Sequence, residues 1–209
     1  SAVGDNSHAE GNDTRASGLG SHAEGLNSHA SGEYAHASGR SSQAQGDFSA
    51  SSGEYTVASG LSSHAEGKQS IASGDYSHAE GLNTDATGDF GSHSEGALTL
   101  ASGSASHAEG ISTEASGANG SHAEGKQATA SGEASHAQNN NCTASGSGSH
   151  AEGVATQAVG AYSHAQNSYT TANGDNSTSA GRYTVADGDN QFVVGTYNIP
   201  LSTEGAFII

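Results

Sequence analysis

The sequence predicts an all-β protein, a parallel β-solenoid with two short strands in each fourteen-residue coil. Three observations lead to this prediction. A seven-residue unit repeats along almost the whole chain, two kinds of unit alternate, and the seventh residue of nearly every unit is glycine. A unit this short cannot bury a core by itself, so successive units are expected to stack on one another.

The composition excludes an ordinary globular core. The chain has 209 residues, among them 31 glycines, one proline, no methionine and no tryptophan, and only 5% of its residues are aromatic. Its commonest apolar residue is alanine. A buried methyl group removes far less surface from water than a leucine or phenylalanine side chain, whose burial is worth about 1.5–3 kcal/mol. Composition alone would permit disorder, but the strict periodicity argues against it.

The repeat covers residues 5–195 as 27 units, with single-residue insertions near Phe90 and Asn119. The third position is Ser or Thr in 23 units, and the fifth is Ala in 23 units. The seventh is Gly except at Asn139 and Asn167. Because Asn is the non-glycine residue that best tolerates a left-handed backbone, the seventh position is predicted to have a positive φ.

The seven-residue period does not indicate a coiled coil. A glycine in every heptad would cost about 1 kcal/mol each in a helix, and no Leu or Ile seam accompanies it. Four or five residues of alternating character fit a short strand, with positions three and five on one face and positions four and six on the other. Units of the form Ser-His-Ala-Glu-Gly, as at residues 7–11, 21–25 and 63–67, alternate with variable ones, which gives the fourteen-residue coil.

The recurring Ser-x-Ala-x-Gly motif resembles the head repeats of trimeric autotransporter adhesins, the YadA-like head, over nearly the whole chain. This resemblance implies a left-handed parallel β-roll, a homotrimer, and a role in attachment to host cells or matrix. The chain departs from the family at positions four and six, where His and Glu replace the usual Val and Ile. Its core is therefore expected to be arranged differently or to be unusually polar.

We expect β-roll head repeats over residues 1–188, and a roll-closing segment over residues 189–209 that leads into a C-terminal region beyond this chain. Residues 191–200 are similar to the segment that closes such rolls in phage tail and neck appendage fibres. This similarity makes a bacteriophage or phage-like tail fibre for host recognition the alternative to a bacterial adhesin.

All twelve histidines occupy position four, and eight of them are followed two residues later by Glu on the same strand face. Stacked coils would align imidazole over imidazole and carboxylate over carboxylate. Burying these side chains inside a dry monomer would cost several kcal/mol for each unpaired ion. The His and Glu side chains are therefore expected to contact water, donors of a partner, or a hydrated subunit interface, and we favour the interface. The predicted structural or interface ladder is His8, His22, His64, His78, His93, His107, His122, His136, His150, His164, Glu10, Glu24, Glu66, Glu80, Glu95, Glu109, Glu124 and Glu152.

Three roles for this ladder remain open. In the structural role, His donates hydrogen bonds to Glu or to the backbone, within or between subunits. A pH-sensing role follows from the titration of His near pH 6.5, because protonation of all twelve would move the formal charge from -17 to -5. Imidazole and carboxylate are also competent metal ligands, but no compact four-ligand cluster is evident, so no metal site and no cofactor is predicted.

A second candidate site is formed by aromatic residues at position two, which recur one coil apart and are expected to stack beside the corners. They either cover turn backbone or contact a glycan. The expected stacks are Tyr34 with Phe48, Tyr76 with Phe90 one residue out of step, and Tyr169 with Tyr183 and Tyr197. The candidate ligand-contact residues are Tyr34, Phe48, Tyr55, Tyr76, Phe90, Tyr162, Tyr169 and Tyr183.

The pattern argues against an enzyme. Catalysis needs one constellation in a concave pocket, whereas a repeat reproduces each feature many times on a flat face. Adjacent Ser and His in a strand point to opposite faces and form no nucleophile-base pair. Five basic residues give no footprint for nucleic acid, and no apolar stretch approaches the roughly 20 residues that would allow direct membrane insertion. The single Cys142 occupies the Ser position of its unit.

The predicted function is that of a non-enzymatic, extracellular, homotrimeric adhesin head or fibre at a bacterial cell surface or on a virion. Its expected partner is a host cell-surface protein or glycan. Ice binding is a weaker alternative, because the Thr residues are scattered among Ser and form no regular rows. Calcium-binding rolls are excluded, since their Gly-Gly-x-Gly-x-Asp nonapeptides are absent from the sequence.

Overall fold

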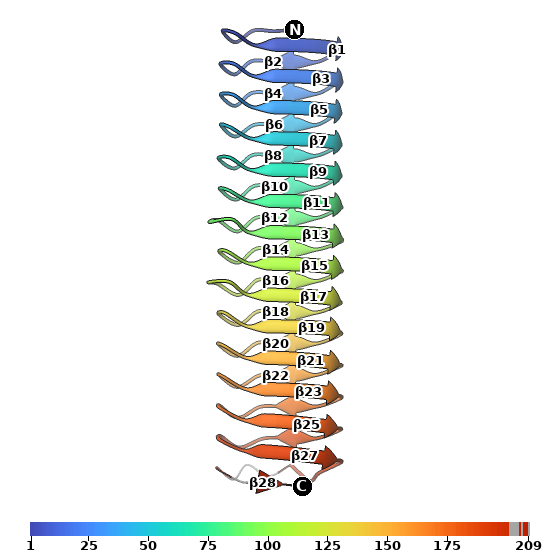
Figure 1. Cartoon of the computed structure of the whole chain (residues 1–209), viewed down its shortest axis with the longest axis vertical. Helices are drawn as coiled ribbons and strands as arrows, with labels where there is room; N and C mark the ends of the chain where they lie inside the picture. The colour runs from blue at the N-terminus through green and yellow to red at the C-terminus, as the bar shows by residue number, and fades with distance from the viewer. Residues whose placement is uncertain (201–204, 206, 209) are drawn as a thin grey trace. The chain divides into compact units, whose positions relative to one another are not determined.

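The computed structural model describes residues 1–200, 205, 207 and 208. The chain contains two compact units, Ser1–Ala105 and Ser106–Ile209, which are built from the same coil. A typical coil contributes one five-residue strand and one two-residue strand, with a corner after each (Figure 1). Among the described residues there is no helix that is long and apolar enough to cross a membrane.

In the first unit the long strands form one parallel sheet in the order β1-β3-β5-β7-β9-β11-β13, and the short strands form another in the order β2-β4-β6-β8-β10-β12-β14. The long strands are β1 His8–Asn12, β3 His22–Leu26, β5 His36–Arg40, β7 Ala50–Glu54, β9 His64–Lys68, β11 His78–Leu82 and β13 His93–Ala97. The short strands are β2 Arg15–Ala16, β4 His29–Ala30, β6 Gln43–Ala44, β8 Val57–Ala58, β10 Ile71–Ala72, β12 Asp85–Ala86 and β14 Leu100–Ala101.

The second unit repeats this arrangement, with long strands in the order β15-β17-β19-β21-β23-β25-β27, followed by β28, and short strands in the order β16-β18-β20-β22-β24-β26. The first sheet contains β15 His107–Ile111, β17 His122–Lys126, β19 His136–Asn140, β21 His150–Val154, β23 His164–Ser168, β25 Thr178–Arg182, β27 Phe192–Thr196 and β28 Phe207–Ile208. The second contains β16 Glu114–Ala115, β18 Thr129–Ala130, β20 Thr143–Ala144, β22 Gln157–Ala158, β24 Thr171–Ala172 and β26 Val185–Ala186.

The register places like residues on like. In β9 and β11, His64 pairs with His78 and Glu66 pairs with Glu80, fourteen residues apart. Backbone N–H groups of one coil donate to carbonyl groups of the next, as from His64 to Ser77 at 2.9 Å. The predicted parallel β-solenoid with two strands in each fourteen-residue coil is therefore confirmed.

The two predicted insertions lie in corners. The extra residues are Gly91, with a φ of 82°, and Gly120, with a φ of 84°. The corners before β13 and β17 project further than their neighbours (Figure 1). Across each insertion the paired residues are fifteen apart, as in His107 and His122, and beyond it the spacing returns to fourteen, as in His122 and His136. The strands and the core are thus unaffected by the added residue.

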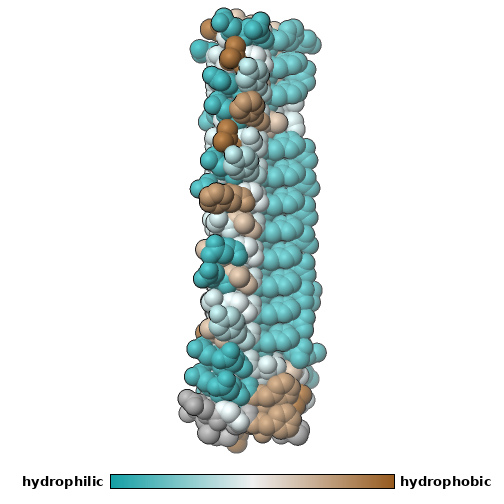
Figure 2. Space-filling model, turned by 60° about the vertical axis from the view of Figure 1, so that its left-hand side comes forward, coloured by the Kyte–Doolittle hydropathy of each residue, from teal (hydrophilic) through white to brown (hydrophobic). Residues whose placement is uncertain are grey.

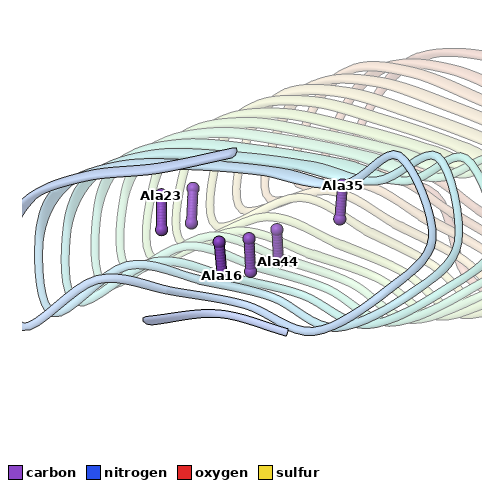
Figure 3. Packing of buried hydrophobic residues seen from close by; sticks show 6 residues of the cluster. Ala16, Ala23, Ala35 and Ala44 are labelled. Carbon is purple, nitrogen blue, oxygen red and sulfur yellow. The ribbon is translucent and has the colours of Figure 1, made fainter. Parts of the chain in front are cut away.

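The core is a thin layer of alanine. Position-five residues such as Ala65, Ala72, Ala79 and Ala86 are fully buried. Figure 3 shows alanines of both sheets pointing into the narrow space between them. Because residues of equivalent coils repeat at strand spacing, a larger side chain in this space would meet its own copy in the next coil as well as the opposite sheet.

The rest of the interior is lined by hydroxyl groups, as expected for a polar core. Position-three Ser and Thr residues are buried, and the hydroxyl of Ser63 donates to the carbonyl of Gly60 at 2.8 Å across a corner. Where a long strand carries Ser in place of the core Ala, a Thr stands five residues later. The pairs are Ser51 with Thr56 at 2.8 Å, Ser94 with Thr99 at 2.7 Å, and Ser179 with Thr184 at 2.9 Å. Each buried hydroxyl introduced in this way meets a partner, as burial requires.

Cys142 lies in one of these hydroxyl positions. It is fully buried, and its Sγ lies 3.3 Å from the carbonyl oxygen of Gly153. Ser28 makes the same contact in its own coil, where its Oγ donates to Gly39 at 3.0 Å. The thiol therefore replaces a serine hydroxyl, as the sequence predicted.

Position seven has a positive φ in only half of the units. At the end of the long strands the prediction is right, with a φ of 97° at Gly67 and 80° at Asn139. At the end of the short strands, as at Gly46, φ is not positive, and glycine is needed for space. A Cβ on Gly46 would lie 2.0 Å from the carbonyl oxygen of Gly60 in the next coil.

Position two has the left-handed backbone throughout, which sequence reasoning missed. Non-glycine residues at this position have φ between 50° at Ala134 and 62° at Tyr76. The signal was present in the sequence as Asn, Asp and Gly at this position in many units, for example Asn6, Asp13 and Gly20, since these residues enter the left-handed region most readily. The aromatic residues at position two therefore stand on left-handed corners.

The C-terminal segment covers the end of the short-strand sheet. The strand β27 continues the long-strand register, with Thr178 paired to Phe192. Among the described residues, β26 is the last strand of the short-strand sheet, and Asn198 covers its free edge. The Oδ1 of Asn198 accepts from the N–H of Val185 at 2.7 Å, and its Nδ2 donates to the carbonyl of Val185 at 2.8 Å. An exposed sheet edge is thereby blocked. The domain boundary at residue 188 stays a prediction.

We predict that Gly46→Ala lowers the free energy of unfolding by about 3 kcal/mol, because its Cβ overlaps the next coil's backbone. Gly91→Ala is the control: its Cβ meets nothing closer than 3.8 Å, so only the left-handed backbone is penalised, by about 1–2 kcal/mol. Thermal unfolding followed by circular dichroism measures both. Equal losses in melting temperature would contradict the contact argument.

Candidate functional site: the histidine and glutamate face

The outer face of the long strands carries the His and Glu side chains. Ser63, directly before β9, and Ala65 in β9 point into the core, whereas the side chains of His64 and Glu66 point outward and are each 43% exposed. Eleven of the twelve histidines lie in the long-strand sheets, and His29 alone lies on a short strand, β4. Figure 2 shows such a file of hydrophilic side chains repeating from coil to coil beside an edge with scattered hydrophobic ones. We call this surface the His/Glu face.

The imidazoles of the His/Glu face stack in parallel. In the first unit the ring centroids of His64 and His78 lie 4.8 Å apart with 4° between the planes, and His78 stacks on His93 at 4.9 Å. Ala50 in β7 interrupts the file there. The second unit holds an unbroken stack over His107, His122, His136, His150 and His164, with centroid distances of 4.7–4.9 Å. The predicted alignment of imidazole over imidazole is present.

Carboxylates run beside the imidazoles. Within a strand, the Nε2 of the imidazole lies 3.6 Å from a carboxylate oxygen in the pair His78 and Glu80, and 3.9 Å in the pair His122 and Glu124. Glutamates also reach the next coil, as from Glu152 to His164 at 3.6 Å. These distances exceed a good hydrogen bond, so the pairs are electrostatic neighbours with room between them.

Several imidazole nitrogens on this face lack a hydrogen-bond partner. The Nε2 atoms of His22, His78, His122, His136, His150 and His164 are buried and have no such partner among the described residues. A buried polar atom without a partner is costly and in native proteins is normally satisfied by water, an ion or another chain. The His/Glu face therefore presents a row of unused ligand and hydrogen-bonding positions.

The family described as the YadA head domain repeat matches the chain in two copies, over residues 51–77, 123–149 and 172–190. The chain carries YadA-like head repeats. Each matched segment contains strands of both sheets, so the family match covers the repeating coil. No curated protein shows significant sequence similarity to the chain.

In these YadA-like repeats, burial lowers the pKa of three imidazoles below its ordinary value of 6.5. They are His78, His136 and His150, and stacked neighbouring imidazoles lower the pKa further, since two adjacent rings resist being charged together. The nearby glutamates act in the opposite direction with smaller effect. Burial and stacking thus favour the neutral form of these three rings, in which each ring has one donor and one acceptor nitrogen.

A groove runs beside the glutamates of the first YadA-like unit. Its volume is about 530 Å³, and its walls include Glu66 and Glu80 together with the glycines that end the long strands. The missing side chains of these glycines leave the space open. The groove offers carboxylate oxygens and bare backbone, but no cation, to whatever approaches this face.

The face of the short strands differs from coil to coil. Position four holds Arg15 in β2, Val57 in β8, Ile71 in β10 and Asp85 in β12. Burial raises the pKa of the Asp85 carboxyl. A surface this variable lacks the constancy of the His/Glu face, so the two sheets of a YadA-like coil offer different kinds of surface.

Some of the predicted aromatic stacks are present. The ring centroids of Tyr34 and Phe48 lie 5.5 Å apart, and Tyr183 lies 4.9 Å from Tyr169 and 4.7 Å from Tyr197. Tyr183 has a ring on each side, so both of its faces are covered, whereas Tyr34 and Phe48 form a pair and remain 54% and 58% exposed. Carbohydrates pack on open aromatic faces, so a ring covered on both sides is suited mainly to covering a corner.

Other aromatic candidates are not stacked. Among the described residues no ring contact joins Tyr76 to Phe90, which stands directly before the inserted Gly91 and is 76% exposed. Tyr162 is 69% exposed and lies beside Gly148 of the preceding coil. The ring of Tyr55 is approached by the guanidinium of Arg40, 5.1 Å from the ring centre. Phe90 and Tyr162 are therefore the aromatic candidates most accessible to a ligand.

We predict that the melting temperature falls by several degrees between pH 8 and pH 5. Since the folded chain keeps His78, His136 and His150 at a lowered pKa, the unfolded chain takes up protons first as the pH falls below 6.5. The contribution of these three histidines to the free energy of unfolding is complete above pH 6.5, and it is lost as the pH falls through their lower pKa in the folded state. Thermal melts across this range measure the effect.

His150→Gln should reduce this pH dependence because it removes one of the three groups. His29→Gln, on the short strand β4, is the matched control and should leave the dependence unchanged. A flat profile for the unmodified chain, or an equal effect of both substitutions, would contradict the assignment.

Proposed function

We propose that this chain is a head segment of a trimeric surface adhesin, with no enzymatic activity, that attaches an extracellular structure to a host cell or matrix. The observation that carries the proposal is the coincidence of YadA head repeats with an outer face on which His and Glu recur in most coils. YadA-type heads are a structural adhesin family whose members form homotrimers at the cell surface. A non-catalytic role also agrees with a surface that repeats each feature in successive coils.

The His/Glu face is the proposed subunit interface. Each imidazole carries a donor and each carboxylate an acceptor, so the same face on a second copy is complementary to it in charge and hydrogen bonding. The unpartnered Nε2 atoms, such as those of His122 and His136, would find partners there. The stacking keeps these groups in register over successive coils, which allows contact along the whole of a unit.

Host contact is proposed for the corners, away from this interface. The left-handed position-two corners hold the exposed aromatic side chains, and the partner would be a host cell-surface protein or a glycan. Phe90 and Tyr162 are the best exposed of the predicted ligand-contact residues. The similarity of residues 191–200 to phage fibre segments stays a prediction, and a virion fibre would use the same attachment chemistry.

The interface is tested by sedimentation of the chain, which we expect to be a trimer at micromolar concentration. Glu109→Lys in β15 should weaken the trimer tenfold or more, because loss of one partner of a buried charged contact costs about 2–5 kcal/mol. Glu114→Lys in β16 is the matched control, with the same charge change five residues along but on the other sheet. A monodisperse monomer, or equal effects of the two substitutions, would refute this interface.

Attachment is tested by adhesion of beads coated with the chain to host cells and to immobilised glycans. Tyr162→Ser should lower adhesion severalfold, since the exposed ring of Tyr162 stacks on no other ring among the described residues. Tyr183→Ser should have little effect because its ring faces are already covered. Circular dichroism confirms that both variants fold. No adhesion by the unmodified trimer to any host surface would contradict the adhesin function.

A further inference from the structure

We propose that the His/Glu face of the second unit binds a divalent transition-metal cation of the Zn²⁺ class. Two triads of side chains there each bring two imidazoles and one carboxylate together: His107, Glu109 and His122 form one, and His122, Glu124 and His136 form the other. In each triad one ligand atom per residue can be chosen so that all three lie within 4.8 Å of one another. The triads share His122, which makes it the central residue of the proposed site.

The fold brings these residues together across neighbouring coils. His107 and Glu109 lie on β15, His122 and Glu124 on β17, and His136 on β19, and the parallel register pairs each histidine with the next. A ligand set of this kind is invisible as a short spacing in the sequence, because its members are about one coil apart. This is why the sequence prediction found no compact cluster and named no metal site.

Small side-chain rotations would complete the coordination. Zinc bonds to imidazole and carboxylate are about 2.0–2.2 Å long, so tetrahedral ligand atoms lie about 3.3–3.6 Å apart. The side chains of His122 and Glu124 are 34% and 31% exposed and face outward, which allows them to turn inward to this distance without any change in the backbone. Remaining coordination positions are open to water or to the same face of a second copy.

The unpartnered ring nitrogens of the stack favour a metal, because a free imidazole nitrogen is a common metal ligand. The Nε2 atoms of His122 and His136 are buried and have no hydrogen-bond partner among the described residues, so binding a cation would satisfy them. The formal charge of -17 also attracts cations to the chain.

The ligand types select the metal. Two imidazoles and one carboxylate suit Zn²⁺, Ni²⁺ or Cu²⁺, whereas Ca²⁺ and Mg²⁺ prefer sites made entirely of oxygen ligands. In the first unit the triad Glu66, His78 and Glu80 has only one imidazole and is expected to bind such metals more weakly. The site of the second unit should therefore bind Zn²⁺ in preference to Ca²⁺.

Calorimetric titration of the metal-free chain with ZnCl₂, and separately with CaCl₂, tests the proposal. We expect Zn²⁺ to bind with at least one ion per chain and Ca²⁺ to give no comparable heat. His122→Gln removes the ligand shared by both triads and should lower the bound Zn²⁺ by at least one ion per chain, or weaken binding about tenfold or more. His29→Gln, which removes a histidine from β4 outside the His/Glu face, should bind as the unmodified chain does.

An unchanged melting temperature of His122→Gln in the absence of metal would show that the variant folds. The double variant Glu109→Gln, Glu124→Gln removes the carboxylate of each triad and should also lower Zn²⁺ binding. Absence of Zn²⁺ binding, equal binding of Ca²⁺, or undiminished binding by His122→Gln would overturn the proposal. Stoichiometry is expressed per chain, so the result does not depend on the trimer or on host attachment.

Discussion

The in-register stacking of equivalent residues at strand spacing is the constraint on which the rest of this structure depends. Every side chain meets a copy of itself, or its substitute, in the coils before and after it. A column must therefore consist of residues that tolerate their own kind as neighbours. Alanine methyls do so in the core, glycines do so where backbones nearly touch, and hydroxyls do so when a corner carbonyl is in reach.

Stacking of identical side chains is least favourable for charged groups, and the His/Glu face shows how the repulsion between like charges is reduced. A column of imidazolium ions would repel itself, but neutral imidazoles stack as flat rings, and the lowered pKa of His136 favours the neutral form of that ring. The carboxylates remain at the edge, partly exposed to water, with imidazole nitrogens beside them. The face is thus stable enough to fold while keeping unused donors and acceptors on its surface.

Much of the fold followed from the sequence because periodicity reports stacking directly. The fourteen-residue coil, the separation of Ala from His and Glu onto opposite strand faces, and the place of Cys142 were predictable from position in the repeat. That the alanines point inward is shown by the structure. The reason for each glycine was not predictable, because glycine is required for two different reasons. Gly67 has a positive φ, whereas Gly46 lies too close to the backbone of the next coil to carry a Cβ. The left-handed backbone at position two was hidden because bulky residues such as Tyr34 share the position with Asn and Gly. The repeat predicted that His107 aligns with His122, but it did not show that His107, Glu109 and His122 bring ligand atoms within 4.8 Å of one another.

The corners at Gly91 and Gly120 have a consequence for how such a chain changes over time. One added residue left the neighbouring strand pairs and core columns in place, because the corner extended outward and absorbed it. Length can therefore vary at these points without any compensating substitution elsewhere, whereas an equal insertion inside a strand would exchange inner and outer side chains for the rest of that strand. The corners are accordingly where new loops would enter the chain at lowest cost to folding.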